Sequence, residues 1–398
     1  MKKKQPPSDR CIACTSCVAH CPVSAVTRQF SGPKLTGPAL ERFRRLKSGD
    51  ELPPEYCSNC KNCDISCPSE VPVSTLNMLA KAAYYKTHKH SLRDWILSHG
   101  ELLAKMGSPM AGLTNIGMAN PLSRIALKKI GISDKMPLPR YAAKSFGALF
   151  KRLWQQSYDD KVVFFPGCYI QYNEPQVGID LVKIMQANRY EVILPENTGC
   201  CGSPLVVNGY LDEALLKARQ NIRELKRWVD QGYPIITGCP SCALMLKQEY
   251  QELFAVEDVA AVAAQLYDAA EFLLELHDAG RLNTDFQPQA GRYLYHAPCH
   301  LRAQGMGLPG RDLLALLPGV EVTDADAGCC GVAGNYGFKN DKYEIAMAIG
   351  AELFQKIQAG QFDAVVSECG TCRLQIAQAT GVKTLHPLSL VRRAYKMS

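Results

Sequence analysis

The sequence predicts a multi-domain α+β protein, with a mainly helical N-terminal domain followed by two related α/β halves. Three observations predict this fold class. The 398-residue chain opens with two runs of four cysteines, and each run ends in Cys-Pro. A different set of five cysteines then occurs twice, with corresponding cysteines about 130 residues apart. Around both sets, strand-like runs alternate with helical patterns, which is typical of α/β units with mostly parallel sheets.

The two N-terminal runs share the spacing C-x-x-C-x-x-C-x-x-x-C-P, and their cysteines are Cys11, Cys14, Cys17 and Cys21, then Cys57, Cys60, Cys63 and Cys67. In such a run three thiolates wrap one 4Fe-4S cubane, and the fourth cysteine reaches the neighbouring cluster. The spacing therefore predicts two cubanes in a ferredoxin-like dicluster domain, with the ligand sets Cys11, Cys14, Cys17 and Cys67, and Cys57, Cys60, Cys63 and Cys21. Structural zinc and a disulfide framework are the alternatives, but zinc sites take two cysteines per loop and need no third at the same interval.

The 35 residues between the two runs contain three pairs that break regular structure, namely Gly32-Pro33, Gly37-Pro38 and Pro53-Pro54. A helix from Ala39 to Lys47 fits between these breakers. Because this insert is long for a small ferredoxin, the dicluster domain is expected to be mainly helical. The expected domains are the dicluster domain at 1–80, a basic amphipathic linker at 81–158, and the two α/β halves at 159–290 and 291–398.

The composition, 47% hydrophobic and 21% charged, is that of a soluble globular protein with sizeable cores. The first ten residues are basic, but no apolar segment follows them before Cys11, so no secretory signal is expected there. Clustered cysteines without an export signal favour a reducing cytoplasm. No nucleic-acid partner is expected.

The linker is strongly basic, with 13 Lys and Arg against 3 Asp and Glu between Lys81 and Trp154. Apolar residues recur in it at helical spacing, namely Leu92, Trp95, Ile96, Leu103 and Met106, then Phe146, Leu149, Phe150, Leu153 and Trp154. Two interpretations stay open: helices lying on a membrane surface, and helices packed on the protein's own domains. The uncharged stretch from Met106 to Ser123 contains prolines, glycines and asparagines, so a transmembrane helix is not expected.

The two five-cysteine sets are Cys168, Cys200, Cys201, Cys239 and Cys242, then Cys299, Cys329, Cys330, Cys369 and Cys372. The predicted strands beside them are Val162 to Phe165, Pro234 to Thr237, Arg292 to Tyr295, and Ala364 to Ser367. The predicted helices are Glu174 to Arg189, Asp212 to Val229, Asp312 to Leu317, and Lys342 to Ala359. Two halves with one shared fold are therefore expected.

Loops at the carboxyl ends of parallel strands meet in one crevice, so each half is expected to gather its five thiols around one point. Each C-x-x-C is expected at a helix start, where the positive end of the helix dipole stabilises thiolates. Gly202 and Gly331 fit tight turns after the vicinal cysteines. Five thiolates exceed the four that a cubane needs, so either one cysteine is free for redox chemistry or the cluster is not a simple cubane. Metal-free redox dithiols and structural zinc are the alternatives.

Histidines flank one cysteine in the pattern His296-x-x-Cys299-His300. Cluster ligands, proton relays and buried polar residues beside a cluster are the three roles considered, and the last is the default. His386 is left unassigned.

The paired ferredoxin-type runs followed by two sets with Cys-Cys-Gly resemble the fused C and B subunits of heterodisulfide reductases and their relatives, including glycolate oxidase iron-sulfur subunits. A closer resemblance is to the C-subunit family of anaerobic glycerol-3-phosphate dehydrogenases, in CIACTSCVAHCPVS, SGPKLTGPALER, SLRDWILSH, CCGSPLVVNGY and CCGVAGNYGFK. In heterodisulfide reductase relatives the Cys-Cys-Gly sets hold noncubane 4Fe-4S clusters, and both sets keep all five cysteines here.

The resemblance implies a non-catalytic electron-transfer subunit of anaerobic respiration, with two cubanes and two further 4Fe-4S clusters. It implies flavin-containing dehydrogenase subunits as partners, glycerol 3-phosphate as the oxidised substrate, quinone as the acceptor, and a peripheral position on the cytoplasmic side of the inner membrane. No G-x-G-x-x-G fingerprint follows a predicted strand, which favours a relay without its own flavin or nucleotide. The alternatives are an iron-sulfur subunit of a glycolate or lactate oxidase, and a heterodisulfide reductase-like catalytic subunit.

Overall fold

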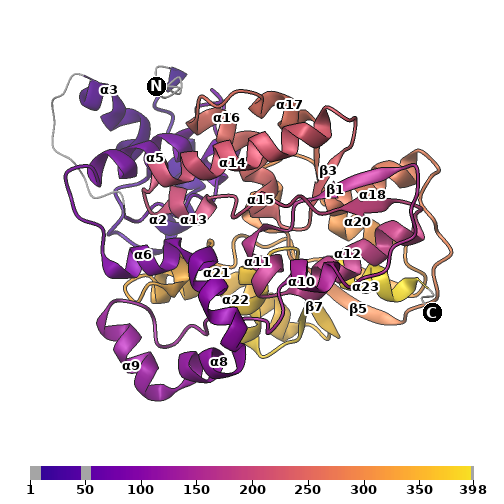
Figure 1. Ribbon diagram of the computed structural model, residues 1–398. Helices are drawn as coiled ribbons and strands as arrows, with labels where there is room; N and C mark the ends of the chain where they lie inside the picture. Colours follow the sequence, from indigo (N-terminus) through magenta and orange to yellow (C-terminus); the bar gives the residue numbers. More distant parts are fainter. Residues whose placement is uncertain (1–9, 46–54, 396–398) are drawn as a thin grey trace.

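The computed structural model describes residues 10–45 and 55–395. It places a helical N-terminal region and a helical connecting segment beside two four-stranded sheets, and helices cover both sheets (Figure 1). This arrangement confirms the predicted α+β fold class.

The N-terminal region consists of short helical pieces and one longer helix: α1 (Ser16–Ala19), α2 (Pro22–Val26), η2 (Leu35–Ala39), α3 (Leu40–Arg45), α4 (Asn62–Ile65) and α5 (Val73–Tyr84). Helix α2 starts at the proline of the first run, because proline lacks the N–H that a first helical turn leaves unpaired. The helix expected from Ala39 to Lys47 is present as α3, and residues 46–47 lie outside the described part. Helix α5 is the longest helix described in this region and buries Val73, Leu76 and Met78.

The connecting segment is also helical, with α6 (Leu92–Ser98), α7 (Gly100–Gly107), η3 (Ser108–Met110), α8 (Ala111–Ala119), α9 (Pro121–Lys129) and α10 (Phe146–Phe150). Ser91 caps α6 by accepting a hydrogen bond from the Asp94 N–H at 3.1 Å. Helices α8 and α9 stand at the edge of the molecule, away from the sheets (Figure 1). Within residues 10–45 and 55–395, every helix is too short or too polar to cross a bilayer.

In the second apolar stripe of this segment Phe146 is buried and Leu149, Phe150 and Leu153 are half-buried, so most of the stripe packs on the protein and does not form the lipid-facing surface that was one of its two interpretations. Phe146 is 0% exposed and packs in the main core, with Phe150 and Leu153 against it. Trp154, at 80% exposure, is the residue of this stripe that faces solvent. A helical period shows that one face is apolar, but it does not distinguish lipid from the protein's own core.

Both halves have a parallel sheet, in the order β2-β1-β3-β4 and β6-β5-β7-β8. The strands are β1 (Lys161–Phe164), β2 (Glu191–Ile193), β3 (Ile235–Thr237), β4 (Leu266–Asp268), β5 (Gly291–Tyr295), β6 (Val320–Asp324), β7 (Ala364–Val366) and β8 (Thr384–Leu385). The central strands β1, β3, β5 and β7 were each predicted to within two residues. Strands β1, β3 and β7 are rich in Val and Ile because helices cover both faces of a parallel sheet, whereas β5 buries Tyr and Leu instead.

The helices of the first half are α11 (Gly167–Tyr172), α12 (Pro175–Ala187), α13 (Ser203–Val207), α14 (Leu211–Val229), α15 (Pro240–Leu244), η4 (Met245–Glu249), α16 (Tyr250–Leu253), α17 (Val259–Ala264) and α18 (Ala269–Asp278). Those of the second half are α19 (Cys299–Arg302), α20 (Pro309–Ala315), η5 (Tyr336–Phe338), α21 (Tyr343–Ala359), α22 (Gly370–Thr380) and α23 (Pro387–Ala394). Helix α20 starts three residues before its predicted start, because Pro309 occupies its first position.

The two halves share one hydrophobic core. Helix α12 of the first half packs on α23 of the second, and the corresponding pair, α18 and α20, packs in the same way. Side chains from both sheets meet in this core, including Phe164, Ile236, Tyr295 and Val366. This reciprocal packing fixes the positions of the two sheets relative to each other, and therefore those of the cysteines at their strand ends.

Candidate metal centres

All 18 cysteines lie in the described residues, all are free thiols, and most are buried. They gather into four groups. Two groups lie in the N-terminal region and one lies in each half. The groups have the same members as the four sets expected from the spacing.

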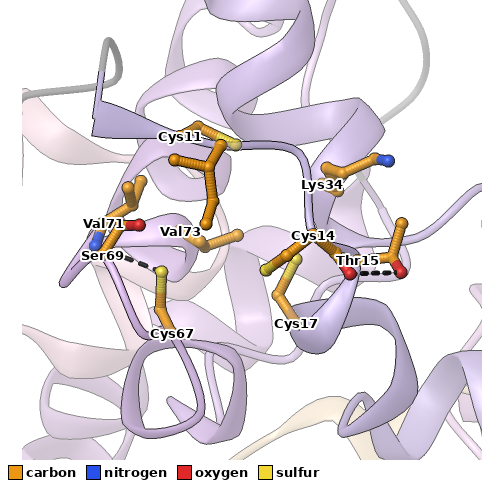
Figure 2. Close-up of a pocket in the computed structure, with 10 residues that line it drawn as sticks. Cys11, Cys14, Thr15, Cys17, Lys34, Cys67, Ser69, Val71 and Val73 are labelled. Carbon is orange, nitrogen blue, oxygen red and sulfur yellow. Dashed lines mark hydrogen bonds between the residues drawn. The ribbon is translucent and has the colours of Figure 1, made fainter.

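The first group contains Cys11, Cys14, Cys17 and Cys67, which line one small pocket together with Lys34 (Figure 2). Cys67 comes from the second run, so the two runs cross as the spacing predicted. The backbone N–H of Val71 donates to the Cys67 sulfur at 3.4 Å. Such amide donors stabilise negative charge on sulfur.

The second group contains Cys21, Cys57, Cys60 and Cys63, and Cys21 is the member contributed by the first run. The Ser24 N–H donates to the Cys21 sulfur at 3.5 Å. Cys17 and Cys63 lie in one small core, so the first two groups are immediate neighbours.

The loops of the two runs share an unusual backbone. Ala13 and Thr15 in the first run have φ of 59° and 66°, and Asn59 and Lys61 in the second have 57° and 65°. Left-handed conformations at non-glycine residues are uncommon and persist where surrounding contacts hold them. Alternating them with cysteines turns three successive sulfurs toward one point.

A buried ionic network holds the second run against the first half. Lys61 lies 3.1 Å from Glu249 and 3.3 Å from Glu252. The Asn59 amide donates to Glu249 at 2.7 Å. Burial raises the pKa of Glu249, but Lys61, His300 and Asn59 outweigh burial and hold this pKa below its usual value.

The third group is the five-cysteine set of the first half. Its thiols form a chain of contacts from Cys168 through Cys200, Cys201 and Cys242 to Cys239. The three loops that carry them follow β1, β2 and β3, whose carboxyl ends lie side by side in the sheet. Cys239 is the residue before α15, as expected for a C-x-x-C at a helix start.

The fourth group repeats this arrangement in the second half. The chain of contacts runs from Cys299 through Cys329, Cys330 and Cys372 to Cys369. Cys369 is the residue before α22. The Arg302 guanidinium approaches the Cys299 sulfur at 4.0 Å, and no sequence motif indicated this contact.

Each vicinal pair ends in a glycine turn. Gly202 and Gly331 have φ of 88° and 90°, and their N–H groups donate to the sulfurs of Cys200 and Cys329 at 3.4 and 3.3 Å. At Gly331 a Cβ atom would collide with the Ala346 carbonyl, so the backbone approach itself excludes a side chain there.

The two halves hold their vicinal pairs differently. In the first, Asn221 accepts from the Gly199 N–H at 2.9 Å and donates to the Cys200 carbonyl at 3.1 Å. The Tyr250 hydroxyl donates to the Cys201 carbonyl at 2.7 Å. In the second, Gly350 takes the place of Asn221, and a Cβ there would lie 2.6 Å from the Cys330 carbonyl oxygen. In the second half, close backbone packing at Gly350 thus takes the place of the hydrogen bond that Asn221 donates to the vicinal pair in the first half.

The groups of the N-terminal region and of the second half are in contact. Cys60 packs against Cys299 and Cys329, and it lines the same cavity of about 20 Å³ as the second-half thiols. Ser241, from the C-x-x-C of the first half, lines this cavity too. Cys60 and Ser241 are distant in sequence from Cys299, so spacing did not indicate this junction.

The first-half thiols border a much larger space. Cys168 and Cys200 lie at a cavity of about 840 Å³. Its walls come from α7, α10 and the loop after β2, and include Glu101, Phe150 and Thr198.

The three histidines considered in the sequence, His296, His300 and His386, have different surroundings. His300 bridges three parts of the chain: its Nε2–H donates to the Asn59 carbonyl at 2.9 Å, and its Nδ1 accepts from the Ser241 hydroxyl at 2.9 Å. His386 is buried, accepts from the Leu388 N–H at 3.2 Å and donates to the Gly238 carbonyl at 3.0 Å, so it caps α23. His296 is buried beside Cys330 and Cys372. Burial lowers the pKa of His296 to about 4.

The thiol groups suit iron-sulfur clusters chemically. Burial raises the pKa of Cys57 to about 11 and is the largest cause raising the pKa of Cys60 and Cys63. Buried thiolates therefore need a compensating cation, and all-thiolate donor sets select zinc or iron-sulfur clusters. Tetrahedral zinc takes four ligands, so it leaves one thiol unused in each five-cysteine set.

Comparison with known proteins agrees with this chemistry. Residues 7–71 match the family model of the 4Fe-4S dicluster domain, and residues 162–247 and 293–377 match that of the CCG Cysteine-rich domain. Fold and thiol groups thus define an iron-sulfur protein that joins a dicluster domain to two Cysteine-rich domains. The chain is 36% identical over 393 residues to the C subunit of anaerobic glycerol-3-phosphate dehydrogenase of Escherichia coli strain K12, covering 97% of this chain and 98% of that protein. It therefore belongs to that C-subunit family, which confirms the resemblance found from the motifs.

Two further relatives have other names. The B subunit of fumarate reductase (CoM/CoB) of Methanothermobacter marburgensis is 29% identical over 402 residues, covering 97% of this chain and 72% of that protein. Lactate utilization protein A 2 of Bacillus cereus strain AH820 is 27% identical over 224 residues, covering 54% of this chain and 89% of that protein.

The hydrogen bond from Tyr250 to the Cys201 carbonyl supplies a test of how the first vicinal pair is held. Tyr250→Phe is expected to destabilise the protein by about 1–3 kcal/mol, because it leaves the buried carbonyl without its donor. Tyr267→Phe, which removes a hydroxyl from a partly buried ring on β4, is the matched control. Anaerobic thermal unfolding measures both, and equal melting temperatures for the two variants would contradict the expectation.

Proposed function

We propose that this chain is the iron-sulfur electron-transfer subunit of a quinone-linked anaerobic glycerol-3-phosphate dehydrogenase. The observation that carries the proposal is the continuity of the thiol groups. The two N-terminal groups are neighbours, Cys60 touches Cys299 and Cys329, and Ser241 connects the second-half cavity to the first-half set. A relay needs such redox sites side by side.

The proposed ligands follow the geometry. One cubane 4Fe-4S cluster is held by Cys11, Cys14, Cys17 and Cys67, and the other by Cys57, Cys60, Cys63 and Cys21. Each five-cysteine set holds one further 4Fe-4S cluster. Because five thiolates exceed a cubane's four open positions, we propose noncubane clusters in these sets.

The protein's own contribution is position and environment. Bound clusters supply one-electron chemistry. The surrounding residues hold the thiolates, exclude water and donate amide N–H groups to sulfur, as at Gly202 and Gly331. These factors set reduction potentials. We propose no substrate chemistry for this chain, so the partners are flavin-containing subunits that oxidise glycerol 3-phosphate.

The surface of α7–α9 supports a peripheral place on the membrane, proposed here on its cytoplasmic side. Large apolar side chains are exposed along it, namely Leu102, Met106, Met110, Leu113, Ile116, Leu122 and Ile125. A large exposed apolar patch marks an interaction site, and we propose that these side chains form one. Lys128 and Lys129 follow in the last turn of α9, and basic residues beside apolar ones suit an anionic lipid surface.

The large cavity beside Cys168 and Cys200 supports quinone as the acceptor. One face of α7 contributes Glu101 and Lys105 to the cavity wall, while Leu102 and Met106 of the same helix are exposed. The cavity therefore adjoins the proposed lipid-facing surface. Its volume of about 840 Å³ falls in the range of ligand sites, whereas the second-half cavity of about 20 Å³ does not.

Iron and sulfide content tests the relay directly. Protein purified without oxygen is expected to contain about 16 iron and 16 inorganic sulfide per chain, because four 4Fe-4S clusters carry that many. Replacing Cys200 and Cys201 by Ser should remove about a quarter of the iron and a quarter of the sulfide, together with one paramagnetic signal. Replacing Cys329 and Cys330 by Ser should remove the same amounts and a different signal. Chemical analysis with electron paramagnetic resonance measures this. A content of about 8 iron and 8 sulfide in the unaltered chain would leave the five-cysteine sets without clusters and contradict the proposal.

Liposome flotation tests the membrane surface. The triple variant Leu113→Ser, Ile116→Ser and Leu122→Ser is expected to bind anionic vesicles many-fold more weakly, because each apolar side chain contributes about 1.5–3 kcal/mol when fully buried. Leu216→Ser, at a site of 62% exposure on α14, is the control. Phe146 is unsuitable for this test because its removal would open the core. Equal flotation of the triple variant and the control would rule out this surface.

Narrowing the large cavity tests the acceptor site. Ala148→Trp and Thr198→Trp, which approach it from α10 and from the loop after β2, are expected to lower quinone reduction by the assembled complex at least tenfold. Cluster reduction by dithionite should stay complete in both. Ala143→Trp, at an exposed position outside the cavity, is the control. Unchanged quinone kinetics in both variants would place the acceptor elsewhere.

A further inference from the structure

His296 has an environment that the relay alone does not explain. It follows β5, is 1% exposed, and both of its ring nitrogens are buried without a hydrogen-bond partner in the described part of the chain. Leaving a buried polar group unpaired costs about 1–3 kcal/mol. Native proteins rarely carry this cost unless ordered water, an ion or a ligand meets the group.

The ring is directed at the thiols of its own half. A nitrogen of His296 and the sulfurs of Cys330 and Cys372 all lie within 4.8 Å of one another. Cys330 and Cys372 are consecutive members of the contact chain in that set. The unpaired nitrogen therefore faces the space in which the thiolates converge.

The first half provides an internal comparison. Counting back from Cys299 and Cys168, His296 corresponds to Phe165, which is fully buried and apolar. Two neighbouring residues are likewise more polar in the second half than in the first. Tyr295, which donates to Glu368 at 2.6 Å, corresponds to Phe164, and Glu368 corresponds to Gly238. At these three positions the second half has Tyr, His and Glu where the first half has Phe, Phe and Gly.

We propose that His296 is a further contact residue of the second-half site, where a ring N–H donates a hydrogen bond to sulfur of the iron-sulfur group and raises its reduction potential above that of the first-half site. This inference rests on the proposed function, since it requires a cluster in that set. The physical reason is that reduction adds negative charge to the cluster, and a donor to its sulfur stabilises the reduced form. Phe165 has no donor, so the first-half site lacks this stabilisation.

The consequence concerns the junction with the N-terminal region. Cys60 touches Cys299 and Cys329, so the second-half site is the one beside the cubane that Cys60 is proposed to hold. A higher potential there favours electron transfer from that cubane to the second-half site and makes the onward step to the first-half site less favourable. His296 is thus a positioning and tuning residue, with no role in bond making.

The test is a redox titration of the full chain, purified without oxygen, followed by electron paramagnetic resonance. His296→Phe copies the first half and is expected to keep the full iron and sulfide content while lowering the midpoint potential of one signal. The other signals should not move. His296→Gln keeps an N–H donor and should restore part of the shift. Phe165→Leu, an apolar exchange at the matching position, is the control and should shift no signal.

A second measurement needs no variant. With ¹⁵N-labelled histidine, the unaltered protein should show a weak nitrogen coupling to the second-half cluster, as a hydrogen bond gives. A strong coupling, as from nitrogen bonded to iron, would overturn the hydrogen-bond role, and so would unchanged potentials in His296→Phe. These results differ from failure of the proposed function, which appears in the unaltered protein as missing iron and sulfide.

Discussion

Negative charge on buried sulfur is the constraint on which this structure depends. The thiol groups bring four or five cysteines together, and 12 of the 18 are buried, where burial opposes ionisation, as at Cys57. Coordination to iron removes this opposition, because a coordinating thiol is deprotonated outright. The loops of the two N-terminal runs bear the cost of left-handed backbone at residues such as Thr15 and Lys61 in order to turn their sulfurs together. In the proposed holoprotein, folding and cluster binding are therefore linked.

The two halves show how one scaffold meets this constraint twice. Both place cysteines after three neighbouring parallel strands and both end the vicinal pair in a glycine turn. The support behind the pair has diverged, from hydrogen bonds by Asn221 and Tyr250 to close packing at Gly350. The strand ends fix where the sulfurs lie, so the side chains around them are free to differ. This freedom is what permits two sites of the same shape to have different electrical surroundings.

Local patterns in the sequence predicted local structure well. The three-residue spacing indicated the crossing of Cys21 and Cys67, and the alternation of strands and helices indicated both parallel sheets. What escaped prediction are the contacts between segments that share no spacing pattern. The contact of Cys60 with Cys299, and the bridge by His300 from Ser241 to Asn59, join segments with no common pattern. The stripe containing Phe146 had the correct period, but a period does not say which surface covers it.

The shared core fixes which neighbours each five-cysteine set has. Because α12 packs on α23 and α18 on α20, the two sets of strand ends cannot move apart without opening one common core. The second-half thiols are thereby kept beside Cys60, and the first-half thiols are kept beside the large cavity. One set thus faces the N-terminal groups and the other faces the space next to α7. In the proposed relay, the contact at Cys60 is therefore the entry from the N-terminal groups, and the large cavity beside Cys168 and Cys200 is the exit.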